Sequence, residues 1–240
     1  MVNDPPAVHR LERVDSTQDE AHRLAAAGAP SGTVIVAERQ TAGRGSRGRS
    51  WESPPGGLWM SVVSRPGSGA GVELLSLRAG LATAATLDGI GGFPTVALKW
   101  PNDVLVDGRK VGGILCEARW QGDQLAWVAV GVGLNVRNRP PAGLRLPGAS
   151  LSEWRADIGV DDLLRALLAE LHGLDRGGPT LARPELAAWR RRDWLRGRAL
   201  RVPVVGTAEG IDADGALRVR RADATLELVR SGDATPAIEF

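Results

Sequence analysis

The strictest pattern in the sequence is an alternation that runs from Trp127 to Val136. One set of alternate residues is entirely apolar: Val128, Val130, Val132, Leu134 and Val136. The other set holds one ring, three small residues and one carboxamide: Trp127, Ala129, Gly131, Gly133 and Asn135. A period of two predicts a β-strand, and the apolar set predicts that one face lies in a core. The second face either packs closely against a helix or forms the floor of a groove for a flat ligand, with Trp127 and Asn135 at its ends.

A tight hairpin is predicted just before this strand. Asp107-Gly108 separates two apolar runs, and this dipeptide favours a two-residue turn, so residues 104–106 should pair with residues 109–117. Two adjacent glycines, Gly112 and Gly113, weaken a strand unless another backbone or a ligand approaches closely. Regular alternation would place one set of side chains on one face: Lys110, Gly112, Ile114 and Cys116. It would place the other set on the opposite face: Val111, Gly113, Leu115 and Glu117.

The remaining pattern indicates an α+β chain in two parts. Strands are expected at 8–14, 33–36 and 58–64, and helices at 18–27, 73–88, 160–173 and 184–195. Thr17 and Glu20 have capping-box spacing at the start of the first helix, and Gly89 is expected to end the second. After Gly197 the pattern changes to short strands at 200–205, 216–220 and 225–229. We therefore predict a main domain over residues 1–196 and a small β-domain over residues 197–240, which the short stretch 205–210 suggests lacks a hairpin.

Composition excludes several classes of protein. A chain of 240 residues with 43% apolar and 24% charged residues is an ordinary globular one. Because no apolar run reaches the length of a membrane span and the first six residues do not resemble a secretory signal, a cytoplasmic protein without a membrane partner is expected. Cys116 is the single cysteine, which excludes a disulfide within the chain and suggests an inert core residue. Of the 30 basic residues only Lys99 and Lys110 are lysines, and the net charge of +2 gives no case for nucleic acid.

Residues 41–57 form a glycine-rich loop with three arginines. Gly43 to Gly48 matches G-x-G-x-x-G, but prolines follow it where a dinucleotide fingerprint requires a helix, so that interpretation fails. Arg44, Arg47 and Arg49 would instead suit a loop that closes over a phosphate or carboxylate and is ordered by it. The alternative is a surface loop without function.

Several catalytic signatures are absent from the sequence. It has no Walker A lysine loop, no G-x-S-x-G, no H-E-x-x-H and no tyrosine. His9, His22 and His172 are scattered and are interpreted as surface or packing residues. A hydrolase with an enzyme nucleophile is therefore disfavoured. The residue types that remain are suited to binding a polyanion and stabilising charge that develops at phosphorus.

Together these segments resemble biotin protein ligases, in family order. The segments are Ser16-Thr17-Gln18 and residues 40–49, 99–103, 108–115 and 131–135. Residues 210–215 are similar to the C-terminal SH3-like module of the same family. The resemblance implies an α+β fold in which a mixed β-sheet is flanked by helices, as in class II aminoacyl-tRNA synthetases, with a small C-terminal SH3-like β-barrel.

The resemblance implies a two-step, ATP-dependent ligase of the monofunctional type. With Mg²⁺ and ATP it would convert biotin to biotinyl-5′-AMP, and then pass the biotinyl group to a lysine of a biotin carboxyl carrier protein or of the carrier domain of a carboxylase. No DNA partner is expected, because the similarity begins near residue 8 and leaves no N-terminal DNA-binding domain; a homodimer stays open. Two alternatives are a lipoate-type ligase, whose usual Arg-Arg and triple-Gly loop is missing here, and an Arg-loop RNA-binding module, which would show a basic surplus and stacking aromatics.

The resemblance also implies roles for individual residues. The biotin set is Ser16, Thr17, Gln18, Gln40, Arg44, Gly45, Ser46, Lys110, Gly113, Gly131 and Gly133. The ATP set is Arg44, Arg47, Arg49, Trp51, Asp103, Lys110 and Asn135. Lys110 and Arg44 would be catalytic, with Lys110 between the biotin carboxylate and the α-phosphate, and Asp103 would face the metal. For Lys99 two alternatives stay open, a role in the site and an ion pair at a strand-to-turn corner. Ser46 stands where several members have arginine, which predicts faster leakage of biotinyl-AMP.

Overall fold

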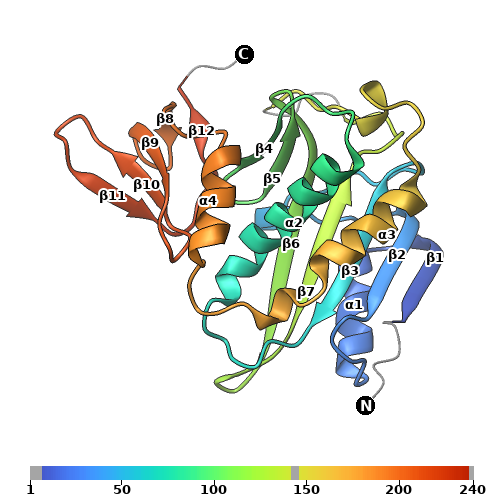
Figure 1. Cartoon of the computed structure of the whole chain (residues 1–240). Helices are drawn as coiled ribbons and strands as arrows, with labels where there is room; N and C mark the ends of the chain where they lie inside the picture. The colour runs from blue at the N-terminus through green and yellow to red at the C-terminus, as the bar shows by residue number, and fades with distance from the viewer. Residues whose placement is uncertain (1–6, 142–145, 238–240) are drawn as a thin grey trace.

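The computed structural model describes residues 7–141 and 146–237 and contains two β-sheets (Figure 1). The larger sheet has seven strands in the order β1-β2-β3-β7-β6-β5-β4. Their bounds are β1 Val8–Val14, β2 Val34–Gln40, β3 Leu58–Ser64, β4 Val96–Lys99, β5 Asp103–Val106, β6 Arg109–Gln121 and β7 Gln124–Leu134. β1 and β2 are parallel and the other neighbours are antiparallel, so the expected mixed sheet is confirmed.

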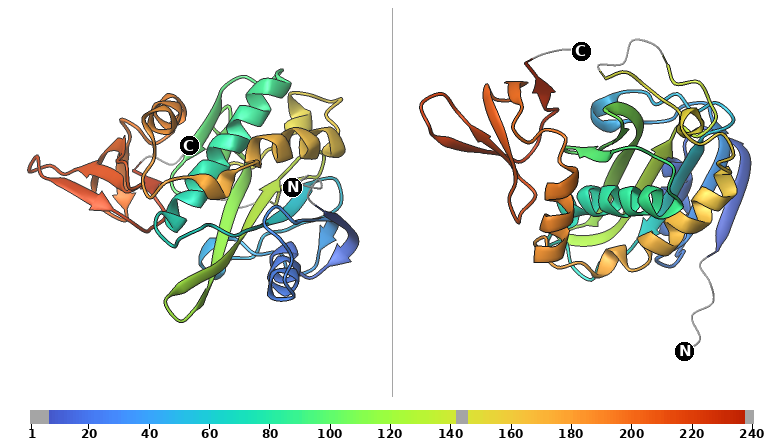
Figure 2. Two further views of the ribbon diagram at one scale, coloured as in Figure 1. Left: turned by 60° about the horizontal axis from the view of Figure 1, so that its bottom comes forward. Right: turned by 45° about the horizontal axis from the view of Figure 1, so that its top comes forward.

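Helices cover both faces of the large sheet (Figures 1 and 2). The α-helices in the described part of the chain are α1 Thr17–Ala26, α2 Leu75–Ile90, α3 Val160–Leu171 and α4 Arg183–Arg192, and short 3-10 turns lie at Ser46–Gly48, Val72–Leu74, Leu151–Glu153 and Leu174–Arg176. α2 and α3 pack on the valine face of β7, where Val128 and Val130 are fully buried. α1 packs on the opposite face, where Ala21 and Ala25 meet Ala129.

Two helix ends differ from the sequence-based expectation. Ser16, not Thr17, is the N-cap of α1, and its hydroxyl accepts from the Gln18 backbone N–H at 3.3 Å. The expected capping box is wrong because the Thr17 hydroxyl bonds to neighbouring strands instead. α2 runs through Gly89 to Ile90 and is capped by Gly91, whose positive φ of 73° favours glycine.

The strand β7 confirms the predicted core face. On its other face, the helix-packing interpretation holds for one half of the strand and the groove-floor interpretation holds for the other half. Ala129 packs against α1, as the helix interpretation requires. Gly131 and Gly133 instead line a pocket. Trp127 and Asn135 do not bracket that pocket, so this part of the prediction is wrong.

The hairpin at Asp107-Gly108 is confirmed, with φ values of 51° and 72° at the two turn residues. The pairing of β5 with β6 shifts register at Val111, which has no partner on β5. Because an extra residue reverses the alternation, Lys110 shares a face with Gly113 rather than with Gly112. The predicted faces of this strand are therefore wrong at Lys110.

The second sheet is antiparallel, in the order β11-β10-β9-β8-β12. Its strands are β8 Ala199–Val202, β9 Gly206–Ile211, β10 Leu217–Arg220, β11 Leu226–Val229 and β12 Thr235–Pro236. The stretch that seemed too short for a hairpin is β9, which pairs with both β8 and β10. The buried residues of this sheet belong to the same apolar cluster as the main core, and the Trp100 indole donates to the Gly215 carbonyl at 2.9 Å. The division into domains at residue 197 stays a prediction. Among the described residues, no helix is both long and apolar enough to cross a bilayer.

Candidate active site

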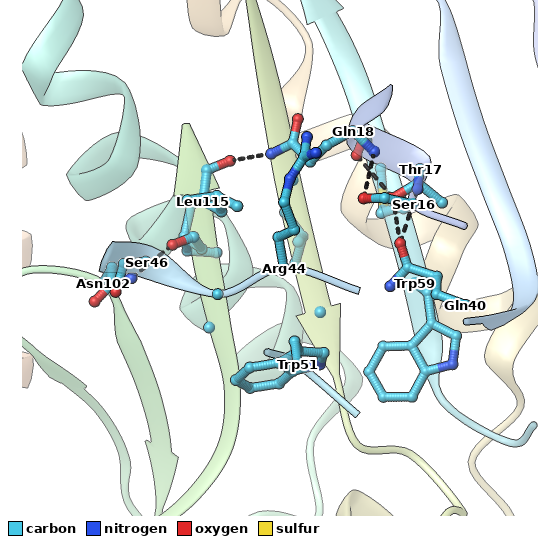
Figure 3. Close-up of a pocket in the computed structure, with 18 of the residues that line it drawn as sticks. Ser16, Thr17, Gln18, Gln40, Arg44, Ser46, Trp51, Trp59, Asn102 and Leu115 are labelled. Carbon is cyan, nitrogen blue, oxygen red and sulfur yellow. Dashed lines mark hydrogen bonds between the residues drawn. The ribbon is translucent and has the colours of Figure 1, made fainter. Parts of the chain in front are cut away.

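A pocket lies on the same face of the large sheet as α1, over the part of that face that α1 does not cover (Figure 3). Its floor is made of paired residues on three strands, because Trp59 and Ser61 of β3 pair with Gly133 and Gly131 of β7. Gly113 of β6 pairs with Gly133 in turn. The absence of side chains at these glycines leaves room above the sheet, as the sequence pattern indicated.

The N-terminus of α1 forms a polar wall of the pocket. Thr17 donates through its backbone N–H to Gln40 Oε1 at 2.8 Å, and its hydroxyl lies 2.9 Å from that of Ser61. The Gln18 amide nitrogen donates to the Leu115 carbonyl at 2.7 Å. Gln18 Oε1 is buried and has no partner, so it can accept a hydrogen bond from a ligand. Ser16 completes this wall and is 1% exposed.

The glycine-rich loop covers the floor. Isolated bridges join Gln40 to Ser53 and Arg44 to Ser50, which fold the loop back on itself. The Trp51 ring lies over the glycine floor, because a Cβ added to Gly133 would come within 2.9 Å of its Nε1 atom. That Nε1 atom is buried without a partner. The loop therefore brings both an aromatic ring and an unused donor to the pocket.

Arg44 crosses the pocket and bonds to carboxylates on two other elements. In Figure 3 its side chain lies between Leu115 and Gln18. One guanidinium nitrogen donates to Asp19 Oδ1 at 2.5 Å, and another donates to Glu117 Oε2 at 2.8 Å. The imidazole of His22, whose Nε2 lies 3.4 Å from Glu117 Oε2, lowers the pKa of Glu117 below its ordinary value, and Arg44 adds to this shift while burial opposes it. Sequence reasoning did not predict this role for Asp19, Glu117 or His22, because Glu117 lies at least 95 residues from the other two and the three give no joint motif.

A second ionic network joins both lysines to the C-terminal sheet. Asp103 accepts from Lys110 at 2.5 Å through one oxygen and from Lys99 at 3.3 Å through the other. Lys99 also donates to Asp233 at 3.2 Å, and Asp233 accepts from Arg49 at 2.9 Å. The ion pair considered for Lys99 is thus present. The ammonium of Lys110 also lies 5.1 Å from the centre of the Trp51 ring, within the range of a cation–π contact.

The described residues do not form a metal centre. They contain no group of three or more His, Cys, Asp and Glu side chains that could hold a metal ion. Both oxygens of Asp103 already accept from ammonium groups, which fits poorly with direct ligation of Mg²⁺. Mg²⁺ commonly binds through substrate phosphates and water. Direct ligation of Mg²⁺ by Asp103 therefore does not fit these contacts.

The structure gathers most of the residues that the sequence singled out. All of the expected biotin set lines the pocket: Ser16, Thr17, Gln18, Gln40, Arg44, Gly45, Ser46, Lys110, Gly113, Gly131 and Gly133. Of the expected ATP set, Arg49 and Trp51 also line it. Three members do not: Arg47 is exposed, Asp103 lies behind Lys110, and Asn135 is 3% exposed and accepts from Asn138 at 2.8 Å. Trp59, Ser61 and Asn102 line the pocket without having been expected.

Comparison with known proteins gives a consistent result. The family model described as "Biotin/lipoate A/B protein ligase family" matches residues 11–135, and "Biotin protein ligase C terminal domain" matches residues 199–234. A biotin--[acetyl-CoA-carboxylase] ligase of Paracoccus denitrificans is 38% identical over 228 residues, which cover 88% of this chain and 92% of that protein. The bifunctional ligase/repressor BirA of Bacillus subtilis is 41% identical over 145 residues, and this match spans 58% of the chain but only 44% of the relative. The biotin protein ligase of Aquifex aeolicus in complex with biotin and ATP has a TM-score of 0.79 and 28% identity, covering 95% of this chain and 97% of that one.

Proposed function

Because the chain belongs to the biotin/lipoate A/B protein ligase family, we propose that it is an ATP-dependent biotin protein ligase. It converts biotin to biotinyl-5′-AMP and transfers the biotinyl group to a lysine of a biotin carboxyl carrier protein or carrier domain. The observation that carries the proposal is that one pocket is lined by both the unpartnered acceptor Gln18 Oε1 and the ammonium group of Lys110. The name of the Paracoccus relative supports a carboxylase as the acceptor.

The polar wall favours biotin over lipoate as the substrate. The ureido ring of biotin carries two N–H donors and one carbonyl acceptor, whereas the dithiolane ring of lipoate carries no strong donor or acceptor. The unpartnered Gln18 Oε1 can accept from a ureido N–H, and the hydroxyl of Ser16 can donate to the ureido carbonyl. A dithiolane would leave Gln18 Oε1 buried and unpaired, at a cost of about 1–3 kcal/mol.

Lys110 is placed to offset charge repulsion in the first step. A carboxylate and a phosphate oxygen about 4 Å apart repel each other by about 4 kcal/mol at the effective dielectric constant of a protein surface. An ammonium between them reverses the sign of the interaction. A carboxylate oxygen of biotin attacks the α-phosphorus of ATP, the bond to the bridging oxygen of the β-phosphate breaks, and pyrophosphate leaves with that electron pair. ATP enters as its Mg²⁺ complex, which neutralises phosphate charge.

The second step needs no nucleophile from the enzyme. The neutral ε-amine of the acceptor lysine attacks the acyl carbon of biotinyl-AMP, the bond from that carbon to the phosphate oxygen breaks, and AMP leaves. One proton is lost from the nitrogen. The pocket contributes orientation, because holding two reactants together removes much of the entropic barrier. Arg44, Arg49 and Trp51 are proposed to contact the adenylate, and Asp103 to orient Lys110.

The proposal includes a cytoplasmic location. The absence of DNA and membrane partners stays a prediction. Whether the protein forms a homodimer is left open. The test of the proposal uses the full chain, Mg-ATP, biotin or lipoate, and a biotin carrier domain. Intact mass measurement should show a biotin-sized increment on the acceptor that requires ATP. A lipoyl increment, or no increment with either acid, would overturn the proposal.

A further inference from the structure

A chain of polar contacts leads from the side of α1 to the pocket. The Trp127 indole nitrogen donates to His22 Nδ1 at 2.9 Å. His22 Nε2 lies 3.4 Å from Glu117 Oε2, the oxygen that accepts from Arg44. The last link, from Arg44 to Asp19, returns to the same helix. This series of contacts therefore joins α1, β6, β7 and the glycine-rich loop.

The hydrogen bond from Trp127 determines which ring nitrogen of His22 carries the proton. Because the indole of Trp127 can only donate, His22 Nδ1 must accept, and the neutral imidazole carries its proton on Nε2. Nε2 is buried and makes no regular hydrogen bond among the described residues, and the carboxylate oxygen beside it is Glu117 Oε2 at 3.4 Å, so a proton on Nε2 faces Glu117. Glu117 in turn has one oxygen shared between the imidazole and the guanidinium. Charge-assisted bonds of this kind are the stronger ones in proteins.

The side chains become more buried along the chain from the loop inward. The side chain of Arg44 is 35% exposed, that of Glu117 is 27% exposed and that of His22 is 11% exposed. The side chain of Arg44 is thus the most exposed of the three, and the side chains of Glu117 and His22 that follow it are progressively less exposed. Glu117 and Asp19 both hold the Arg44 guanidinium above the pocket, and His22 is the least exposed group beside Glu117.

We propose that Trp127, His22 and Glu117 are positioning residues that hold the Arg44 guanidinium over the pocket and so keep the glycine-rich loop closed on biotin and its adenylate. The inference rests on the proposed function, because it assigns a role in retaining that substrate. It requires no contact between His22 and any ligand. It also explains why this histidine, which no motif contains, is buried beside the site.

The test compares variants that keep or remove one contact. Glu117→Gln removes the charge facing Arg44, and we expect the KM for biotin and the release rate of biotinyl-AMP to rise roughly 10-fold, with kcat changed much less. His22→Leu removes both contacts of the imidazole and should act in the same direction. His22→Gln should restore the wild-type KM, because a glutamine can accept from Trp127 through its oxygen and donate to Glu117 through its nitrogen.

The matched control is Arg23→Gln. Arg23 neighbours His22 on the same helix, and within residues 7–141 and 146–237 its ion pair is with Glu20 on the exposed side, at 2.6 Å, so its loss should leave the KM unchanged. Equal KM values for His22→Leu and His22→Gln, or a wild-type KM in Glu117→Gln, would overturn the inference. If His22→Leu fails to fold, the KM values of Glu117→Gln and His22→Gln still test the inference.

A measurement without substrates separates this inference from the proposed function. The imidazole ¹⁵N shifts of the three histidines report their tautomers, and His22 should carry its proton on Nε2. A proton on Nδ1 would overturn the chain of contacts even if the protein biotinylates its acceptor. Conversely, failure of the wild-type chain to biotinylate an acceptor would overturn the proposed function while leaving the tautomer as expected.

Discussion

The two lysines offer a matched pair of perturbations, because each donates to a different oxygen of Asp103. Lys110 lines the pocket, whereas Lys99 is 5% exposed, lies outside the pocket lining and also donates to Asp233. We therefore expect Lys110→Met to lower the rate of adenylate formation and Lys99→Met to lower stability. Lys110→Arg should lose most adenylation and still fold, since it keeps a charge for Asp103 but needs more room beside Trp51.

The expected magnitudes follow from what each lysine leaves behind. Removing every partner of a buried charge lowers the free energy of unfolding by about 3–5 kcal/mol. Lys99→Met leaves Asp103 with Lys110 and Asp233 with Arg49, so we expect a smaller loss of about 2 kcal/mol in the free energy of unfolding. For a chain of this size that corresponds to a fall in Tm of about 4–8 °C. Removing a group that stabilises developing charge typically costs about 10²–10³ in rate, which we expect for Lys110→Met.

Two assays measure these effects separately. Pyrophosphate release in the presence of biotin and Mg-ATP gives the rate of the first step, and thermal denaturation gives Tm. Near wild-type pyrophosphate release from Lys110→Arg would refute the role assigned to Lys110. Equal losses of rate in Lys99→Met and Lys110→Met would refute the distinction between the two lysines.

Three further outcomes are expected. Ser46→Arg should slow the release of free biotinyl-AMP, measured by its appearance in the filtrate without acceptor; an unchanged rate would contradict the interpretation of Ser46. Burial raises the pKa of the Cys116 thiol to about 12, so at pH 8 only about one thiol in ten thousand is ionised and iodoacetamide should label the protein only after denaturation. Asp233→Asn removes the charge that Arg49 and Lys99 share, and should raise the KM for ATP and speed proteolysis of the glycine-rich loop; wild-type values of both would exclude this link.

Local patterns predicted the elements whose structure depends on neighbouring residues. The alternation at 127–136 became β7, and Asp107-Gly108 became a turn with two positive φ values, because period and turn chemistry act over a few residues. The pocket residues could be predicted as a set because their segments matched one family in order. The prediction of faces failed at Lys110 because a bulge depends on the pairing of two strands, and pairing is not visible in one strand.

The residues that were missed act through contacts between distant segments. Glu117 and His22 are separated by 95 residues in the sequence numbering, and neither belongs to a recognised motif. Asp233 reaches Lys99 from the segment between β11 and β12, across 134 positions. The same limit explains the capping error, since the Thr17 hydroxyl was expected to cap a helix but finds better partners on β2 and β3. Such competition between local and tertiary partners is decided only when the strands are assembled.

The two networks also bear on how the pocket attracts an anionic ligand. The cations around it are Arg44, Arg49, Lys99 and Lys110, and the carboxylates that pair with them are Asp19, Asp103, Glu117 and Asp233. Equal numbers of opposite charges leave little net field, so general attraction of polyanions, as an RNA-binding surface would need, is weak here. What the pairing provides is fixed orientation, since charged groups already held in place need no reorganisation when charge develops at phosphorus. Selectivity for one acid and one nucleotide then depends on the shape and hydrogen bonds of the pocket, and the ion pairs serve to keep Arg44 and Lys110 where that shape requires them.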